Sequence, residues 1–256
     1  MAQDASKIVF RLRGLPANLA TLDNVANIIH IGFFDLPGPR ARVFSLSTSL
    51  HQYETTRVAT VMFDILPLVI QKNPSANQWE ASIRSGADSY HLVLDTHFLG
   101  MTPLNHIEPL RHIYDCIAIS GLASHPFGSW QPRASDKTYM WIRDALPKRL
   151  GGIKTIIYGY DTKLDESRSF QNIPDLAREL INCLQTYGCN LQPAKPIVFL
   201  AHSLGGLVLK EALVQLYYYS NKDYESLLYL VRGVVFFGVP NLDMEQFYYS
   251  LYIKRY

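Results

Sequence analysis

The chain has 256 residues, 48% of them hydrophobic, and a formal net charge of +2. It is long enough to bury a core in one large domain or two small ones. A charge balance this close to neutral creates no field that would recruit nucleic acid or acidic lipid. The 3 cysteines are too few for a disulfide framework and lack metal-ligand spacing, so we expect no metal and no cofactor.

The start of the chain lacks the apolar segment of a secretory signal. No apolar run approaches the roughly 20 residues that a membrane-spanning helix needs, and the longest, Val61–Ile70, contains Asp64 and Pro67. These features predict a cytoplasmic protein without a transmembrane segment.

Residues 1–105 have the pattern of a small α+β region. We expect strands at Ile8–Leu12, Arg42–Leu50, Thr55–Phe63 and Tyr90–Asp95, a helix capped by Thr21 and Asn24, and a helix over Leu66–Lys72. This β-α-β-β-α-β order is typical of RNA-recognition-type folds. Only Phe10 and Phe63 would serve as base-stacking aromatics there, so a structural or protein-binding role is favoured and no nucleic-acid partner is expected.

Residues 106–256 alternate regularly between strands and helices. We expect strands at Tyr114–Ser120, Thr155–Tyr160, Ile197–Ala201 and Val231–Val239, and helices at Tyr139–Leu150 (broken near Pro147), Pro174–Tyr187 and Leu204–Tyr219. The strands are apolar throughout, which indicates burial on both faces and hence a parallel sheet covered by helices on each side. Right-handed crossovers then give a doubly wound architecture.

The decisive stretch begins at Ile197 and reads IVFLAHSLGGLVLKEA, a strand, a tight turn and a helix. Ser203 falls at the turn, where strained backbone would expose its hydroxyl as a nucleophile. Gly205 provides the small neighbour that such a turn requires, whereas Ala201 replaces the usual preceding glycine. The alternative is that Ser203 merely caps a buried helix, but a cap requires neither the glycines nor the apolar helix that follow.

Acyl transfer also needs two backbone N–H groups directed at the developing oxyanion. The helix that begins at Leu204 would provide one, and Leu122, after the turn residue Gly121, would provide the other. His125 in the same loop is a candidate base. His202 is expected to be a packed structural residue, because adjacent strand residues face opposite sides.

Several segments together resemble a known family. They read SGLASHPFGSW, YMWIRDALP, IIYGYDTKL, SFQNI, VFLAHSLGGLVLKEAL and VVFFGVPN. They resemble the serine-active-site, lipase-like α/β-hydrolases related to GPI-inositol deacylase, and most closely a fungal branch in which this domain precedes NACHT, ankyrin or tetratricopeptide regions. The resemblance implies a partial α/β-hydrolase sheet, hydrolysis of an ester or lipid-ester substrate, a role in signalling, further C-terminal domains or protein partners, and peripheral association with mitochondrial or endoplasmic reticulum membranes.

The chain departs from the family pattern after the serine. The family order places an acid and then a histidine downstream, yet all 8 histidines lie at or before His202. Asp243 is the candidate acid, with a solvated loop carboxylate as its alternative. We therefore expect a chain truncated relative to its relatives, with impaired turnover, or else a non-catalytic interaction module built on a hydrolase fold.

Overall fold

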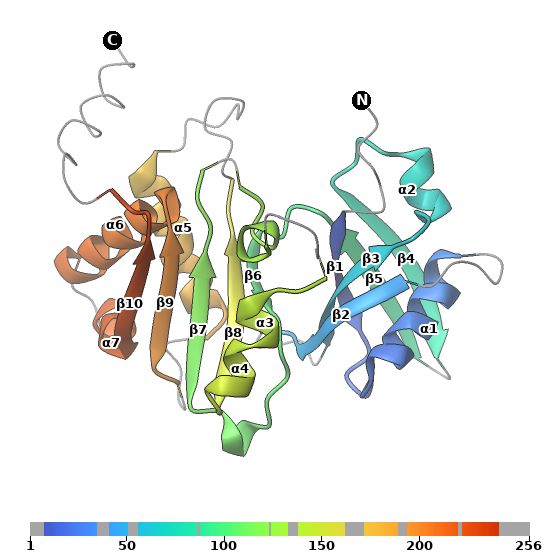
Figure 1. The fold of residues 1–256 in the computed structure, drawn as a ribbon, viewed down its shortest axis with the longest axis horizontal. Helices are drawn as coiled ribbons and strands as arrows, with labels where there is room; N and C mark the ends of the chain where they lie inside the picture. The colour runs from blue at the N-terminus through green and yellow to red at the C-terminus, as the bar shows by residue number, and fades with distance from the viewer. Residues whose placement is uncertain are drawn as a thin grey trace, which may run out of the picture.

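The structure is a computed structural model that describes residues 8–34, 41–50, 56–85, 88–122, 124–132, 138–161, 172–188, 194–219 and 222–240. It contains two five-stranded sheets that lie side by side (Figure 1), the first built from residues 9–95 and the second from residues 100–237. The predicted α/β class, with an α+β region preceding a mainly parallel sheet, is confirmed.

The first sheet is antiparallel throughout and has the order β2-β3-β1-β5-β4. Its strands are β1 (Val9–Leu15), β2 (Ala41–Thr48), β3 (Arg57–Phe63), β4 (Gln78–Ser85) and β5 (Asp88–Asp95), and its helices are α1 (Leu22–Phe33) and α2 (Leu68–Lys72). Helix α1 starts in the predicted capping box, in which Thr21 and Asn24 satisfy each other's backbone N–H groups.

Strand β4 was not predicted, although its pattern was available in the sequence. Trp79 and Ile83 are buried in the first core and Ala81 packs against it, while polar residues alternate with them. This period of two is the signature of a strand with one face in the core.

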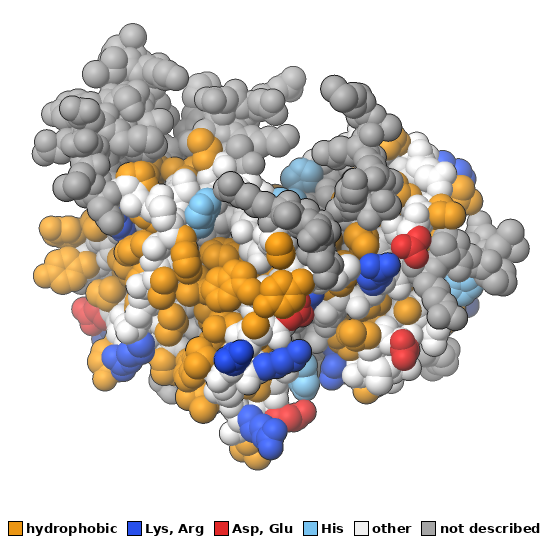
Figure 2. All heavy atoms as spheres, viewed as in Figure 1, with side chains coloured by type: hydrophobic (Ala, Val, Ile, Leu, Met, Phe, Trp, Pro, Cys, Tyr) orange, Lys and Arg blue, Asp and Glu red, His pale blue; other side chains and the backbone are white. Residues whose placement is uncertain are grey.

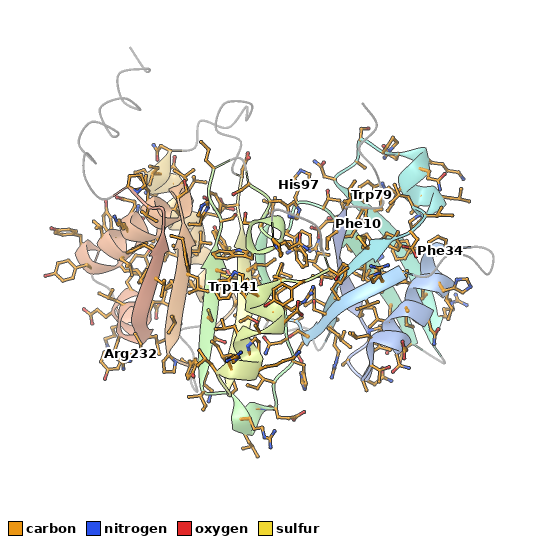
Figure 3. The ribbon with its side chains drawn as sticks, in the orientation of Figure 1. Phe10, Phe34, Trp79, His97, Trp141 and Arg232 are labelled. Carbon is orange, nitrogen blue, oxygen red and sulfur yellow. The ribbon has the colours of Figure 1, made fainter. Side chains whose placement is uncertain are left out.

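Phe10 and Phe63, the candidate base-stacking residues, lie inside the first core. Each is 1% exposed, and their rings pack edge to face at 5.3 Å. Trp79 packs against Phe10 in the same way at 5.9 Å (Figure 3). The two phenylalanines are buried in one core with Val25 and Ile29 of α1, so they are not available to stack on bases.

The second sheet has the order β10-β9-β7-β8-β6. Its strands are β6 (Gly100–Pro103), β7 (Tyr114–Ile119), β8 (Ile153–Gly159), β9 (Ile197–His202) and β10 (Val231–Phe237). β10, β9, β7 and β8 are parallel, as predicted, whereas β6 is antiparallel to β8. β6 was not predicted, and it carries part of residues 1–105 into the second sheet.

Helices cover both faces of the second sheet (Figure 1). One face packs against α5 (Ile173–Thr186) and α6 (Leu204–Tyr218), and the other packs against the short α3 (Trp141–Asp144) and α4 (Leu146–Arg149). Short 3-10 turns lie at Pro109–Arg111 and Gly128–Trp130, and α7 (Lys222–Leu230), which was not predicted, precedes β10.

The predicted break in the helix over 139–150 lies at Ala145 rather than at Pro147. Pro147 occupies the first turn of α4, where a missing N–H leaves no hydrogen bond unmade. The proline therefore begins a helix here instead of ending one.

Candidate functional site

The chain turns sharply at Ser203, between β9 and α6. Ser203 has φ 49° and ψ −122°, and the only other described non-glycine residue with a positive φ is Phe98. Such a conformation is costly for a residue with a Cβ and persists only when its surroundings enforce it. Within the described residues, the Ser203 side chain makes no capping hydrogen bond to α6. The geometry therefore matches a nucleophile elbow better than an ordinary helix cap.

Main-chain contacts hold this turn in place. The Ser203 N–H donates to the carbonyl oxygen of Phe237 at 3.0 Å, which ties the turn to the end of β10. The Gly206 N–H donates to the Ser203 carbonyl oxygen at 3.0 Å. A Cβ on Gly205 would lie 2.3 Å from the carbonyl oxygen of Ser120, so only glycine fits there.

The loop after β7 approaches the serine closely. Because β7 and β9 are parallel neighbours, with Ile119 paired to Ala201, their ends meet at one edge of the sheet. A Cβ on Gly121 would lie 2.8 Å from the Cβ of Ser203 and 3.0 Å from Nδ1 of His202. The structure thus brings together Gly121 and Ser203, two of the residues predicted from the sequence.

Tyr160 anchors the same loop and was not predicted to belong to the site. Its hydroxyl donates to the carbonyl oxygen of Ser120 at 2.9 Å, in a buried position. Burial raises its pKa well above the usual value for tyrosine, so the hydroxyl remains a donor. The two residues are 40 positions apart, so no local pattern could have paired them.

The two candidate oxyanion donors belong to the two segments that meet at Ser203. Leu204 is the first residue of α6 and is 4% exposed, and Leu122 follows Gly121 and is 51% exposed. A helix N-terminus has unpaired N–H groups and a partial positive charge. Both amides therefore belong to segments that meet at Ser203.

His125, the candidate base, is held by backbone groups through both ring nitrogens. Its Nε2 lies 2.7 Å from the carbonyl oxygen of Thr96, and its Nδ1 accepts from the N–H groups of Phe127 at 3.1 Å and Gly128 at 3.3 Å. This pattern requires the neutral ring with the proton on Nε2. Burial lowers its pKa in agreement. The histidine stabilises the loop and presents neither nitrogen to Ser203.

His202, expected to be a packed structural residue, lies against the loop after β7, where a Cβ on Gly121 would be 3.0 Å from its Nδ1. Its Nδ1 is buried and has no hydrogen-bond partner among the residues that the structure describes. The Oγ of Ser120, on the neighbouring strand end, is likewise buried without a partner in the described part of the chain. Unpaired buried polar atoms are uncommon, and these two lie beside the loop that carries Gly121.

The candidate acid Asp243 lies outside the described residues. The carboxylate Asp161 lies just after β8, at the same edge of the sheet as Ser203. Burial, and after it the charge of Asp161, raises the pKa of Glu179 on α5 above its ordinary value.

An apolar surface adjoins the turn. Val235 is 45% exposed and Phe237 is 38% exposed on β10, and Figure 2 shows hydrophobic side chains gathered over this side of the molecule. The ring of Phe237 packs edge to face against Trp130 at 6.1 Å and Trp141 at 6.4 Å, and Trp141 is labelled in Figure 3. Since Phe237 also accepts the Ser203 N–H, this surface begins beside the candidate nucleophile.

Within the described ranges, no helix has the length and apolar character needed to cross a bilayer.

Comparison with known proteins shows sequence similarity over part of the chain. No protein-family model matches the chain. Human Protein SERAC1 is 25% identical over 158 residues, which cover 55% of this chain and 23% of SERAC1. Mouse Protein SERAC1 is 26% identical over 159 residues, with the same shares. The zebrafish protein is 22% identical over 160 residues, which are 55% of this chain and 24% of the relative. The chain is thus similar to Protein SERAC1 over about half of its own length and spans about a quarter of the length of these curated relatives.

Proposed function

We propose that this chain is a serine-hydrolase-type domain in which the hydroxyl of Ser203 attacks an ester. The observation that carries this proposal is the backbone of Ser203, held at φ 49° while its side chain leaves α6 uncapped. Helix caps normally have extended backbone and accept from the first turn. A positive φ at serine between a parallel strand and a helix instead favours a nucleophile.

The expected chemistry is acyl transfer. Ser203 Oγ forms a bond to the ester carbonyl carbon, and the N–H groups of Leu122 and Leu204 stabilise the oxyanion. The bond to the leaving alcohol then breaks, and the alcohol receives the proton that the serine gave up. A water molecule then attacks the acyl carbon, the bond to Ser203 Oγ breaks to release the acid, and Oγ takes up the proton that the water gives up.

Attack by Ser203 requires a group that accepts the proton of its hydroxyl. No histidine follows Ser203 in the sequence, and both ring nitrogens of His125 are engaged by the backbone. In well-studied serine enzymes, loss of a triad member lowers kcat by about 10⁴-fold or more. We therefore expect acylation of Ser203 to be slow in these 256 residues, with Asp243 remaining the candidate acid.

The substrate class is an ester or a lipid ester. The apolar surface at Val235, Phe237 and Trp141 starts beside Ser203 and suits an acyl chain better than a polar alcohol. We infer kinship with the GPI-inositol-deacylase-related hydrolases, and the fungal branch is the one whose segments this chain resembles. From that kinship we expect the protein to be cytoplasmic and to associate peripherally with mitochondrial or endoplasmic reticulum membranes. Cell fractionation would test this location.

A non-catalytic interaction module is the second candidate function. The exposed apolar strand β10 favours it, because an edge strand with side chains such as Val235 and Phe237 normally receives a partner. The role of the fold would then be to bind a partner protein or a C-terminal domain along β10, and not to catalyse a reaction. Stable capture of such a partner together with an inert Ser203 would favour this function over hydrolysis.

A fluorophosphonate probe with chemical rescue tests the hydrolase proposal. The wild-type chain, Ser203→Ala and the matched control Ser226→Ala, which alters an exposed serine on α7, are incubated with the probe with and without imidazole. We expect slow labelling that imidazole accelerates, in wild type and in Ser226→Ala but not in Ser203→Ala. Free imidazole can accept the proton of a serine in place of a histidine side chain, so an acceleration that is lost in Ser203→Ala identifies Ser203 as the labelled nucleophile.

Two outcomes would contradict the proposal. One is labelling that is equal in Ser203→Ala and in wild type. The other is a chain whose Ser203 stays unlabelled at high imidazole while circular dichroism shows it folded. Fast labelling without imidazole would keep the hydrolase proposal and show that the chain contains a base after all.

A further inference from the structure

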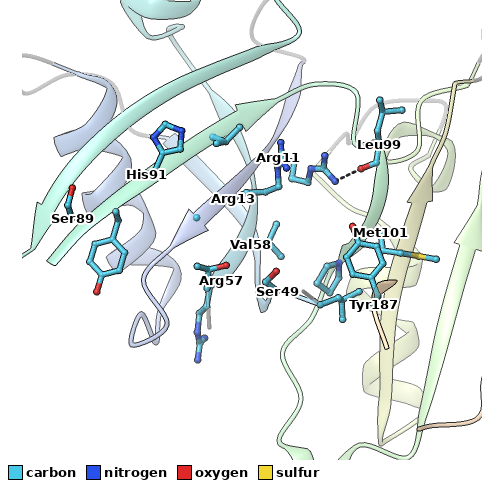
Figure 4. Close-up of a pocket in the computed structure, with 16 residues that line it drawn as sticks. Arg11, Arg13, Ser49, Arg57, Val58, Ser89, His91, Leu99, Met101 and Tyr187 are labelled. Atoms are coloured by element: carbon cyan, nitrogen blue, oxygen red, sulfur yellow. Dashed lines mark hydrogen bonds between the residues drawn. The ribbon is translucent and has the colours of Figure 1, made fainter. Parts of the chain in front are cut away.

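A concave site lies where the first sheet meets the second, and its lining includes neither Ser203 nor Gly121. It is an open pocket of about 510 Å³ between β1, β3 and β5 on one side and β6 with the end of α5 on the other (Figure 4). Its lining includes Arg11 and Arg13 from β1, His91 from β5, Met101 from β6 and Tyr187 after α5. The sequence interpretation singled out none of these residues.

Two arginines share one carboxylate at the base of this pocket. The Nε of Arg11 lies 2.8 Å and the Nε of Arg13 lies 3.2 Å from the same oxygen, Oδ2 of Asp95. The side chains of Arg11 and Asp95 are each 6% exposed, whereas that of Arg13 is 44% exposed. Arg11 and Asp95 therefore form a buried pair, and the second positive charge belongs to Arg13, which is partly exposed at the pocket.

In the described part of the chain, the other hydrogen-bond acceptors of the two arginines are neutral groups. Arg11 Nη1 donates to the Leu99 carbonyl oxygen at 2.9 Å and to Thr102 Oγ1 at 3.0 Å, which are neutral acceptors. Arg13 Nη2 donates to Gln78 Oε1 at 3.3 Å, also neutral. Burial lowers the pKa of Arg11. The nearby charge of Asp95 opposes this shift, and the charge of Arg13 lowers the pKa further. Arg13 shares its carboxylate with Arg11, so an anion in the pocket would give it a counter-ion of its own.

The backbone of β1 forms a bulge beside Arg13. The pairing of β1 with β3 shifts between Leu12 and Leu15, and Gly14 within that bulge has φ 79°. A Cβ on Gly14 would lie 2.0 Å from the carbonyl oxygen of His91, so only glycine allows this approach. Bulges of this kind redirect side chains and are frequent next to binding sites.

Arg57 and His91, which also line the pocket, each contact a partner other than Asp95. Arg57 extends away from Arg11 and Arg13 (Figure 4), and its Nε donates to the Ala17 carbonyl oxygen at 2.9 Å. His91 Nε2 lies 3.3 Å from Glu80 Oε2. Among the residues that the structure describes, no acidic side chain lines the pocket, whereas the hydroxyl-bearing residues Ser49, Thr56 and Ser89 do.

We propose that this pocket binds the phosphate group of a small anionic ligand, with Arg13 as its principal contact and Arg11 as the buried charge behind it. A guanidinium fork matches the oxygen atoms of phosphate in geometry as well as in charge. Serine and threonine hydroxyls add neutral donors suited to the same oxygens. The site is separate from Ser203, and its ligand is independent of the hydrolase proposal.

Binding of phosphate-bearing probes tests this inference. Isothermal titration calorimetry measures inorganic phosphate and glycerol 3-phosphate against wild type, Arg13→Gln and Arg84→Gln. Arg84 lies on β4, is exposed and does not line the pocket. Arg84→Gln therefore serves as a control that removes the same charge as Arg13→Gln at a place outside the pocket. We expect Arg13→Gln to weaken binding about tenfold or more and Arg84→Gln to leave it almost unchanged. Arg13→Lys, which keeps the charge but loses the fork, should fall between them.

A lipid arm distinguishes the source of the phosphate. Sedimentation with phosphatidylcholine vesicles, with or without phosphatidic acid, is run on the same variants. Arg13-dependent binding to the phosphatidic acid vesicles alone assigns a lipid headgroup, and Arg13-dependent binding of the soluble probes assigns a free phosphate ester. The proposal is overturned if folded wild type binds neither, or if Arg84→Gln weakens binding as much as Arg13→Gln does. If Arg13→Gln does not melt like wild type, the same comparison is made with Arg13→Lys.

Discussion

A methyl group on Gly121 would lie 2.8 Å from the Cβ of Ser203. The loop after β7 and the turn after β9 are therefore in contact at the place where the hydrolase proposal needs an oxyanion donor and a nucleophile. No side chain fits between them without moving one of the two segments.

Gly121→Ala should reduce labelling of Ser203 by a fluorophosphonate about tenfold or more, because displacement by a fraction of an ångström misplaces the oxyanion donors. The matched control is Gly128→Ala in the same loop, where a Cβ has its nearest contact, His125 Cβ, at an ordinary 3.5 Å. Equal labelling of the two variants would contradict a role for the contact between Gly121 and Ser203.

Gly205→Ala should destabilise the fold by about 1–3 kcal/mol through overpacking. The new Cβ would lie 2.3 Å from the Ser120 carbonyl oxygen and 2.8 Å from Cγ2 of Ile119, both in the core of the sheet. Gly151→Ala, where a Cβ meets nothing within 4 Å, is the control. Urea unfolding measures both, and a Gly205→Ala chain as stable as wild type would disprove the tight fit.

Tyr160→Phe should lower the free energy of unfolding by about 1–2 kcal/mol, because the buried carbonyl of Ser120 loses the donor that lies 2.9 Å away. It should also slow labelling of Ser203, since the anchored loop carries Gly121. Tyr90→Phe removes only an exposed hydroxyl 3.4 Å from Asp88, so it should change neither quantity. A Tyr160→Phe chain with unchanged labelling would show that this anchor does not position the loop.

His125 should make stability depend on pH. Burial lowers its pKa below the ordinary value of 6.5, so the unfolded chain takes up a proton before the folded chain does. Its contribution is complete above about pH 6.5 and is lost as the pH falls below that value. Protonation of Nδ1 would also remove the acceptor for Phe127 and Gly128.

His125→Asn, whose amide oxygen replaces that acceptor, should lose less stability than wild type between pH 7.5 and 5.5, as measured by urea unfolding. The ion pair of His112 with Asp115 at 2.9 Å is present in both chains, so it cancels in the comparison. An identical pH dependence in the two chains would exclude His125 as its source.

The sequence predicted the elements whose signals are local. Pro174 and Gly188 bracket α5 as expected, with Gly188 at φ 68°, because a proline suits a first turn and a glycine suits a left-handed end. The glycines after Ser203 likewise predicted the sharp turn. Strand β4 was missed although Trp79 and Ile83 alternate with polar residues, since a pattern this polar reads equally as a loop.

The sequence by itself determined the parallel sheet, the turn at Ser203 and the loop after β7, because periodicity and glycine chemistry act over a few neighbouring residues. Only the tertiary structure decided that His125 is fixed by backbone groups and that Tyr160 holds Ser120. It also decided that Arg11 and Arg13 share Asp95, a partner 84 positions from Arg11. Such contacts depend on strand order and register, which are set by the packing of the whole chain and not by any local pattern.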